Sequence, residues 1–486
     1  MDRLHHNKSH IIYFSVMLIL LAIAAFNLFY QLGKFPIYSW DEARHGVSAY
    51  EMVRNHNYIV NTYRGNPDYW NLKPPLSFWT IIAGYKIAGF NALGLRIFSA
   101  IFAFLTIIMV AAYGYKKHGK LASIISTVVL LTSTQYITNH SARTGDADSL
   151  FIFLFTIAIL SLLLWEQNNI LLYVSGLAFA FAFLTKSWHA GNIAIIIGLY
   201  LFLTGKYKLL TLRNWISLGI CMILPILIWG FIRYQYDGVT FFKGMIMYDL
   251  LHRSSTPIEG HIGGVFYYVS IISRYFINWI YVICILGLLF LFNRNFPFKK
   301  IIASEKRNEL IGLCLWVLIP FILFTFAKTK VRWYILPIYP ALAIITGALA
   351  SKLILKGKWI TKVILVGAIL SVSIFYEIEI CTYLNNPPTN NKLSLIEMIT
   401  NKKSTEGDSL YIYQPSKKVS WAQSDVLTAE LSDNLHVNNG DFEQFLQKDK
   451  DLLLVPKKLF SQQLISSNHL KVIDSDQWGY MVEKSS

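Results

Sequence analysis

The sequence predicts an all-α polytopic membrane protein with about eleven transmembrane helices and a small C-terminal α/β domain outside the membrane. Of the 486 residues, 54% are hydrophobic and only 15% are charged, which is unlike the composition of a soluble globular protein. Apolar runs of about 18 or more residues recur along the chain, and each can cross roughly 30 Å of hydrocarbon. The composition turns polar after Asn385-Asn386-Pro387-Pro388, which predicts a separate C-terminal domain.

The first apolar run is expected to remain as a transmembrane helix. It extends from Ile11 to Tyr30, behind a short polar start that contains Arg3 and Lys8. The run is long and no small-residue cleavage site follows it, so a signal peptide is the weaker interpretation. The expected spans are 11–31, 94–115, 121–138, 149–165, 169–185, 191–204, 215–232, 272–292, 310–326, 334–350 and 361–381.

Basic segments between the spans give the predicted orientation. If the spans alternate in direction, these segments all fall on one side: the N-terminus, 116–120, 206–213, 294–307 and 352–362. The positive-inside rule assigns that side to the cytoplasm, so the C-terminus lies outside. We therefore expect a transmembrane domain over 1–381, with a first outer loop at 32–93, and an extracytoplasmic domain over 382–486. The absence of a eukaryotic retention signal favours a bacterial inner membrane.

The net charge of +16 belongs to the membrane domain. From Thr382 onward the chain has 11 Lys against 13 Asp plus Glu, a net charge of −2, which leaves +18 for the remainder. The outer domain is thus nearly neutral and offers no basic face to a nucleic acid. The four cysteines lie in or at the end of apolar runs, which argues against disulfides and a Cys-ligated metal.

The C-terminal domain is expected to contain short strands between helices. Its β-like runs are 410–413, 452–455 and 479–482, and its plausible helices include 391–402 and 441–449. It shows no catalytic motif, so we expect the chemistry in the membrane domain.

Two charged motifs stand in the first outer loop. Asp41, Glu42 and Arg44 come directly after the first span, at the depth where a site facing the bilayer would open. Lys73 precedes Pro74 and Pro75, which cannot continue a helix and so present the lysine on a rigid bend. Taken singly, Asp41 is better explained as a helix N-cap and Lys73 as an interfacial anchor.

Two further motifs lie at the outer ends of later spans. Arg143, Asp146 and Asp148 crowd the turn 139–148, where a single Asp would be enough to cap a helix. Around residues 328–340, Lys330, Arg332 and Tyr334 stand among aromatics and two prolines. That pattern fits an aromatic belt at the membrane interface, or a clamp for a phosphate with an aromatic face for a sugar. Cations gathered on the outer side oppose the topology rule, which favours an anionic ligand.

These motifs occur in one order that resembles a known family. They are Asp41-Glu42-Ala43-Arg44, Lys73-Pro74-Pro75-Leu76, Arg143 to Asp148, Leu184-Thr185-Lys186 and Lys330 to Pro337. The chain resembles the GT-C membrane glycosyltransferases of the aminoarabinose-transferase and protein-mannosyltransferase superfamily over most of its first 350 residues.

The resemblance implies roles for individual residues. Asp41 would be the catalytic base and Lys73 would hold the phosphate of a polyprenyl-phosphate sugar donor. Asp146 or Asp148 would be the second acidic residue, and Leu150 and Phe153 favour Asp148. Tyr334 would shape the site. The other candidates are Glu42, which would line the substrate site, and the cations Arg44, Arg143, Lys330 and Arg332, which would contact the donor phosphate.

One departure concerns the metal. Aminoarabinose transferases carry a Glu before this lysine and bind a metal through the tyrosine, whereas this chain has Leu72 there. The resemblance therefore leaves the cofactor open, with a divalent metal ion as the candidate. His252, His261 and Glu259 could supply ligands or line the substrate site, although such histidines more often just line a polar loop.

We therefore predict transfer of a monosaccharide from a polyprenyl phosphate to an outer acceptor, a lipid, protein or glycan, by one inverting displacement. A lipid flippase or transporter is the alternative, and it would need charges at mid-membrane and an internal repeat. An enzyme that moves a whole oligosaccharide also stays open. No nucleic-acid partner is expected.

Overall fold

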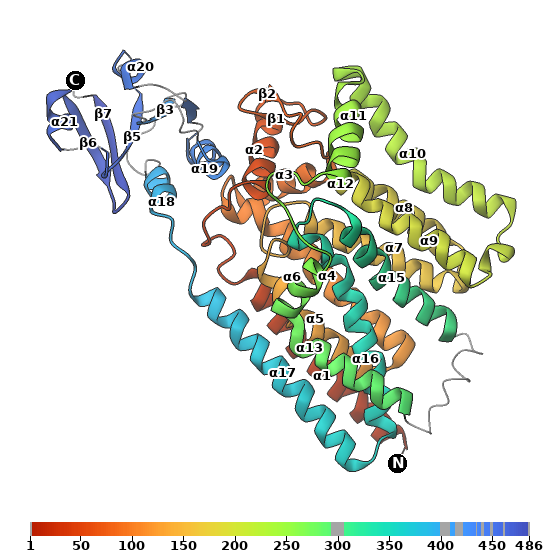
Figure 1. Ribbon diagram of the computed structural model, residues 1–486. Coiled ribbons are helices and arrows are strands. Elements are labelled where there is room, and N and C mark those ends of the chain that lie inside the picture. Colours follow the sequence, from red (N-terminus) through yellow and green to blue (C-terminus); the bar gives the residue numbers. More distant parts are fainter. Residues whose placement is uncertain are drawn as a thin grey trace.

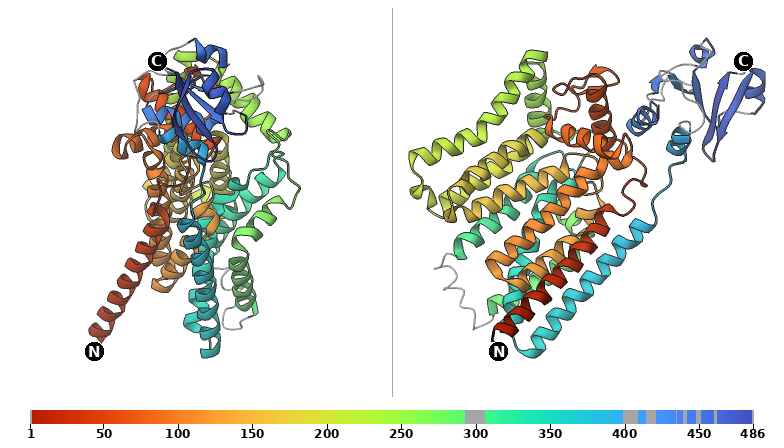
Figure 2. Two further views of the ribbon diagram at one scale, coloured as in Figure 1. Left: turned by 90° about the vertical axis from the view of Figure 1, so that its left-hand side faces the viewer. Right: turned by 180° about the vertical axis from the view of Figure 1, so that it is seen from behind.

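The computed structural model describes residues 2–292, 306–398, 409–413, 421–433, 435–438, 442–447, 451–459 and 462–484. A long helical bundle carries a cap of short elements and a small sheet domain at one end (Figure 1). The N-terminus lies at the other end of the bundle (Figure 2). Most of the predicted inner loop 294–307 lies outside the described residues.

Long apolar helices build the bundle and confirm the polytopic fold. Among the described residues, nine segments are long and apolar enough to cross a membrane. The bundle helices are α1 (Asp2–Phe29), α4 (Ala92–His118), α5 (Lys120–Leu131), α7 (Asp148–Leu164), α8 (Ile170–Lys186), α9 (Gly191–Leu203), α10 (Leu212–Asp237), α13 (Tyr267–Phe292), α15 (Lys306–Phe326), α16 (Tyr339–Lys356) and α17 (Trp359–Asn385).

The difference between nine and eleven has a simple origin. Helices α8 and α9 are separated only by the short turn η2 (Ser187–Ala190), so they count as one helical segment, Ile170–Leu203, although they run in opposite directions, with Glu166 before α8 paired to Lys206 after α9. The expected span 121–138 is interrupted, because α5 ends at Leu131 and a short α6 (Thr134–Thr138) follows. At the break the hydroxyls of Thr132 and Ser133 donate back to the carbonyls of Val128 and Val129, each at 2.7 Å.

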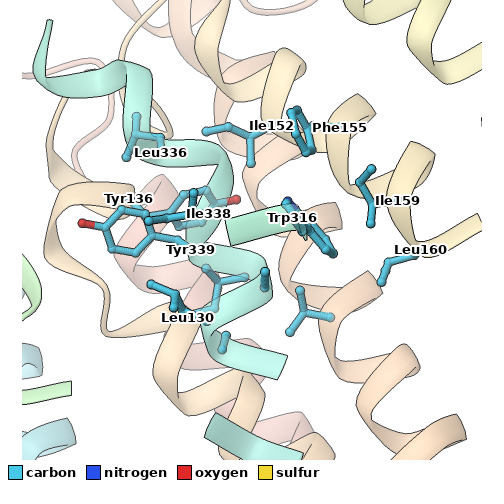
Figure 3. Close-up of a cluster of buried hydrophobic side chains, with 14 of the residues drawn as sticks. Leu130, Tyr136, Ile152, Phe155, Ile159, Leu160, Trp316, Leu336, Ile338 and Tyr339 are labelled. Carbon is cyan, nitrogen blue, oxygen red and sulfur yellow. The ribbon is translucent and has the colours of Figure 1, made fainter. Parts of the chain in front are cut away.

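A packed cluster of buried aromatic and aliphatic side chains joins α6, α7, α15 and α16 (Figure 3). Trp316 of α15 is fully buried, stacks near Phe155 and donates its indole N–H to the carbonyl of Pro337 at 2.8 Å. The hydroxyl of Tyr136 donates to the carbonyl of Ala103 at 3.0 Å. Because the Trp316 indole and the Tyr136 hydroxyl both have hydrogen-bond partners, the cluster can form a rigid apolar core between these helices.

Short elements connect and cap the bundle helices. In the first outer loop these are α2 (Asp41–Arg54), the hairpin β1 (Thr62–Tyr63) and β2 (Asn66–Pro67), and α3 (Leu76–Ala88). The remaining ones are η1 (Trp165–Gln167), η3 (Lys206–Leu209), α11 (Thr240–Gly244), η4 (Met245–His252, a π-helix), α12 (Arg253–Ser255) and η5 (Arg332–Ile338).

The C-terminal region forms the expected small sheet, in strand order β4-β3-β5-β7-β6. The pairs β3–β4 and β3–β5 are parallel, and β5–β7 and β6–β7 are antiparallel. Its elements are α18 (Asn391–Glu397), β3 (Ser409–Ile412), α19 (Gln423–Asp433), β4 (His436–Asn438), α20 (Phe442–Leu446), β5 (Leu452–Pro456), α21 (Gln462–Ser467), β6 (Leu470–Ser475) and β7 (Gly479–Lys484). The division of the chain at residue 382 stays a prediction.

The sheet domain shares a hydrophobic core with the first outer loop. Val47 of α2 and Leu95 of α4 belong to the same buried cluster as Val426 and Leu427 of α19. The helices approach closely at Gly46, where a Cβ atom would lie 2.3 Å from Leu427 Cδ2. Docking of α19 therefore acts on the helix that begins at Asp41.

Two carboxyl groups meet in this interface and make it sensitive to pH. Glu51 of α2 is hydrogen-bonded to Glu430 of α19, and both side chains are 8% exposed. Burial raises the pKa of both carboxyls, and their mutual proximity raises that of Glu430 further. Their ionised forms are thus disfavoured in the docked state.

Replacing Glu430 with Gln is expected to weaken the pH dependence of docking. A carboxyl with a raised folded-state pKa stabilises docking at low pH, and this contribution is lost as pH rises through that pKa. Hydrogen exchange of α19 amides should therefore become faster in the wild type as the pH rises, after correction for intrinsic exchange. It should rise less steeply in Glu430→Gln, where only the buried Glu51 carboxyl still titrates. The exposed Glu443 provides the control, since Glu443→Gln should behave like the wild type.

Candidate active site

A cavity of about 730 Å³ opens at the capped end of the bundle. Its walls come from the first outer loop, the segment 138–148, η2, the region 249–261, η5 and α17. Eight of the predicted residues line it: Asp41, Lys73, Asp146, Asp148, Glu259, His261, Arg332 and Tyr334. Segments far apart in sequence thus bring acidic, basic and aromatic groups to one place.

Asp41 is the first residue of α2. Its backbone carbonyl accepts a hydrogen bond from His45 Nδ1 at 2.7 Å, and its Oδ2 lies 3.7 Å from His140 Nε2. Burial alone would raise the pKa of Asp41, but Lys73 and His140 outweigh it and hold the pKa below its usual range. Asp41 is therefore an ionised carboxylate at neutral pH.

His45 stays neutral beside it. Burial, with help from Lys73, lowers the pKa of His45 to about 3. Its Nδ1–H is donated to the Asp41 carbonyl, so Nε2 carries a lone pair, and within the described part of the chain no group hydrogen-bonds to it. His45 thus places an uncharged imidazole ring next to Asp41.

A cluster of acidic groups surrounds His140. His140 Nδ1 lies 3.0 Å from Asp146 Oδ2 and 3.6 Å from Asp148 Oδ2, and Lys186 forms an ion pair with Asp148. Burial by itself would lower the pKa of His140, but Asp146, Asp148 and Asp41 raise it to about 9. Burial raises the pKa of Asp146, and His140 opposes that effect. The cluster thus contains the two basic groups His140 and Lys186 beside three carboxyl groups when Asp41 is included.

The cavity also has cations around Tyr334. Arg253 Nη1 donates to the Tyr334 hydroxyl at 3.0 Å, and its Nε lies 3.2 Å from Asp249 Oδ1. Lys186 Nζ lies 5.3 Å from the centre of the Tyr334 ring. Lys73 is half-buried, contacts Asn71 Oδ1 at 3.4 Å and forms no ion pair with any described residue. Lys73 is therefore the cation best able to accept an external anion.

Backbone strain is concentrated at the cavity. Among the described residues, eight non-glycine residues have positive φ, and four of them line the cavity. These four are Trp40 (φ 68°), His140 (φ 55°), Ser187 (φ 43°) and Glu259 (φ 55°). Such conformations cost about 1–3 kcal/mol each and persist where the surrounding structure enforces them. The strained backbone at Trp40 and Ser187 sets the directions of their chain neighbours Asp41 and Lys186. The strain at His140 sets the direction of its own side chain.

Glu42 lies outside the cavity and joins three segments. Its carboxylate pairs with Arg96 at 2.6 Å and 2.9 Å, and both side chains are at most 1% exposed. It also accepts hydrogen bonds from the backbone N–H groups of Tyr38 and Gly145, each at 2.8 Å. Glu42 thus fixes the Asp146–Asp148 segment to the start of α2.

Three predicted phosphate-binding cations also lie away from the cavity lining. Arg143 donates to the carbonyls of Asn27, Leu28 and Tyr30 at the end of α1, and Lys330 donates to carbonyls at the end of α15. Both therefore cap helix C-termini, where carbonyl groups lack partners. Arg44 pairs with Asp68 at 2.7 Å and 2.8 Å and stacks on two aromatic rings.

His252 is turned to its own helix, where its Nδ1 lies 3.2 Å from the Thr256 hydroxyl, and it does not line the cavity. The structure adds cavity residues to which the sequence gave no role, above all His45, His140, Lys186 and Arg253. His45, His140 and Lys186 belong to or adjoin the recognised motifs. Arg253 carries no local signal beyond being a cation in an outer loop.

The residues present do not fit the metal that the resemblance implies. Leu72 is 3% exposed and belongs to the apolar core, so no carboxylate stands at that position. The Tyr334 oxygen accepts from Arg253, and Lys186 lies beside its ring, so two cations already flank it. A metal ion there would meet repulsion without a compensating carboxylate.

Of the groups in the described ranges, only His140, Asp146 and Asp148 form a set of three whose donor atoms lie within 4.8 Å of one another. Lys186 already pairs with Asp148, and the raised pKa of His140 favours the imidazolium, which cannot ligate a metal. We therefore assign no metal to this set.

Comparisons with known proteins agree with this architecture. Residues 72–229 match the family model described as dolichyl-phosphate-mannose-protein mannosyltransferase, starting one residue before Lys73. An uncharacterized protein of Aquifex aeolicus is 29% identical over 72% of this chain and 68% of its own length. The undecaprenyl phosphate-alpha-4-amino-4-deoxy-L-arabinose arabinosyl transferase 2 of Pseudomonas fluorescens is 22% identical over 70% of this chain and 60% of its own length.

A solved structure has the same fold over nearly the whole chain. The crystal structure of ArnT from Cupriavidus metallidurans bound to undecaprenyl phosphate superposes with a TM-score of 0.74, at 15% sequence identity, and covers 97% of this chain and 98% of that one. The shared fold therefore includes the outer cap and the C-terminal sheet domain as well as the bundle.

Proposed function

Since this chain is a GT-C membrane glycosyltransferase of the aminoarabinose-transferase and protein-mannosyltransferase superfamily, we propose that it transfers one monosaccharide from a polyprenyl phosphate to a hydroxyl group outside the bacterial inner membrane. One observation carries the proposal: the Asp41 carboxylate and the unpaired Lys73 ammonium line the same cavity at the capped end of the bundle. The N-terminus lies at the opposite end, which supports an outer location for this cavity (Figure 2).

The proposed reaction is a single displacement. Asp41 accepts the proton of the acceptor hydroxyl while that oxygen forms a bond to the anomeric carbon of the sugar. The bond between this carbon and the phosphate oxygen breaks, and the phosphate leaves with the electron pair. One base and one direction of attack invert the anomeric configuration.

The cations near the cavity stabilise the leaving phosphate in this proposal. Lys73 has no carboxylate partner among the described residues, and Arg253 and Lys186 stand around Tyr334. Charge-assisted contacts from such groups stabilise the negative charge that develops on the phosphate. A phosphate at Lys73 would also weaken the attraction of this lysine for the Asp41 carboxylate, so donor binding should make Asp41 more basic.

Similar proteins support the class of sugar donor more strongly than any other part of the proposal. A structural neighbour was crystallised with undecaprenyl phosphate, and several relatives carry that lipid in their names. The sugar and the acceptor are not indicated by these likenesses, and Leu72 and the cations at Tyr334 set this cavity apart from the metal-binding arrangement expected of aminoarabinose transferases.

Deletion of the gene followed by mass spectrometry of membrane lipids tests the function. Loss of a transferase should leave its donor unused, so a polyprenyl-phosphate sugar should accumulate and one glycosylated acceptor should disappear. Returning the wild-type gene should reverse both changes. Loss of the product without donor accumulation on the outer face would instead favour a flippase.

Replacing Lys73 with Gln is expected to raise the donor KM about 10- to 100-fold, since a charge-assisted contact contributes about 1.5–3 kcal/mol. Part of the loss should appear in kcat, because the leaving phosphate needs the same cation. Initial rates with the accumulated donor in membranes of the deletion strain give both values. Lys86 in α3 is exposed, so Lys86→Gln serves as the control, and unchanged donor kinetics in Lys73→Gln would contradict the assignment.

A further inference from the structure

We propose that His140 is a positioning residue for the base Asp41: its imidazolium lies between Asp41 and Asp146 and holds the Asp41 carboxylate ionised and aimed into the cavity. This inference rests on the proposed function, in which Asp41 is the base. Two distances support it. His140 Nε2 lies 3.7 Å from Asp41 Oδ2, and His140 Nδ1 lies 3.0 Å from Asp146 Oδ2.

The imidazole ring has little freedom to turn. It stacks on Trp333 with ring centres 3.6 Å apart and planes within 1° of parallel. Its backbone is held at φ 55°, and its side chain is 16% exposed. A ring fixed in this way directs Nε2 toward Asp41 in each catalytic cycle.

Asp146 lies at ion-pair distance from the ring and is itself held in place. The Thr144 hydroxyl donates to Asp146 Oδ2 at 2.7 Å, and the Asp148 N–H donates to Asp146 Oδ1 at 2.9 Å. Asp148 itself pairs with Lys186, which leaves Asp146 as the carboxylate nearest to His140. The second acidic segment therefore acts on Asp41 through His140, since it lies on the far side of the ring.

The charges around both groups define what removal of His140 should do. Asp41 faces Lys73, His45, Lys186 and His140, and His140 faces Asp41, Asp146 and Asp148. Removing one cation from beside a carboxylate raises the pKa of that carboxylate. The acid limb of the pH–rate profile, which reports ionisation of the base, should therefore move to higher pH.

The test compares His140→Gln with His140→Arg in the full-length protein. Purified protein is added to membranes of the deletion strain, and consumption of the accumulated polyprenyl-phosphate sugar is followed from pH 9 down to pH 3, because the base titrates below the usual range of a carboxyl. We expect His140→Gln to slow the reaction about 10- to 100-fold, the range found for residues that orient a catalytic group, and to shift the acid limb up by about 1 pH unit. His140→Arg, which keeps the cation, should restore the position of the limb.

Several outcomes would overturn the inference. A slower His140→Gln enzyme with an unmoved acid limb would mean a purely structural role, and full activity would mean no role. Loss of wild-type activity on chelation, restored by a divalent ion that His140→Gln no longer binds, would make His140 a metal ligand instead. If His140→Gln does not fold, His140→Arg carries the test, because a shifted limb in that variant contradicts the proposal.

Two controls separate this inference from the proposed function. His436→Gln, at an exposed position in strand β4, should match the wild type. Asp41→Asn should be inactive at every pH, and if it is active the proposed function fails. An inactive Asp41→Asn together with an unmoved limb in His140→Gln would refute the positioning role alone.

Discussion

Replacing Asp41 with Asn is expected to stop sugar transfer while the donor lipid still binds. The amide has nearly the shape of the carboxylate but cannot accept the proton of the acceptor hydroxyl, and a general base typically contributes about 10²–10⁴-fold to the rate. The main donor contacts in the proposal are Lys73 and Arg253, which the substitution leaves in place. Transfer is measured by mass spectrometry of the donor and the product in membranes of the deletion strain.

The pattern of the loss is as informative as its size. An effect on kcat with an unchanged donor dissociation constant is the mark of an interaction that acts mainly in the transition state. Asp41→Glu should retain a trace of activity, because the base is present but displaced. Glu166 lies outside the cavity, and its side chain is 48% exposed, so Glu166→Gln serves as the control. A fully active Asp41→Asn enzyme would rule out Asp41 as the base.

The two residues on which the proposal depends could be found from the sequence because their motifs resemble those of a known family, whereas residue type alone favoured a helix cap for Asp41 and an interfacial anchor for Lys73. Asp41 follows the first span, and Lys73 stands on a proline bend, so both positions are set by their neighbours in the chain. The structure puts both on the cavity wall. Their proposed roles in base catalysis and phosphate binding still await the experiments above.

The other charged residues could not be sorted in this way, because their partners are remote in sequence. Glu42 meets Arg96 and Gly145, and Arg143 meets carbonyls more than a hundred positions away at the end of α1. Residue type alone cannot distinguish a cation that caps a helix from a cation that binds a phosphate. Arg253 enters the cavity only through the folding of η4 and α12 against η5.

The fold was more predictable than the site, since apolar length alone specifies a span. The expected helical membrane domain and the small C-terminal sheet are both present. Sequence patterns missed β4, which has only three residues, and β6, whose side chains are mostly exposed. Both are edge strands, where burial imposes little apolar pattern.

Among the residues outside the cavity, Arg96 is expected to be the one whose replacement reduces activity most. It is fully buried, pairs with Glu42, and donates to the carbonyls of Leu32, Phe35 and Pro36 at 2.8–3.0 Å. Through Glu42 the same network holds the Gly145 N–H. Arg96 thus links the end of the first helix, α2, α4 and the acidic segment.

Replacing Arg96 with Met should destabilise the protein by about 3–5 kcal/mol, because breaking a buried pair leaves the Glu42 charge without its partner. The double variant Glu42→Leu/Arg96→Met removes that charge, but it should recover only part of the loss, since the three carbonyls and the Gly145 N–H remain without partners. Thermal unfolding in detergent measures both effects, and Arg213→Met, at an exposed position, is the control. Because the network also positions Asp146 and Asp148, activity should fall even below the unfolding temperature. An Arg96→Met protein with wild-type stability and rate would mean that the carboxylate of Glu42 does not need its partner to hold the cap in place.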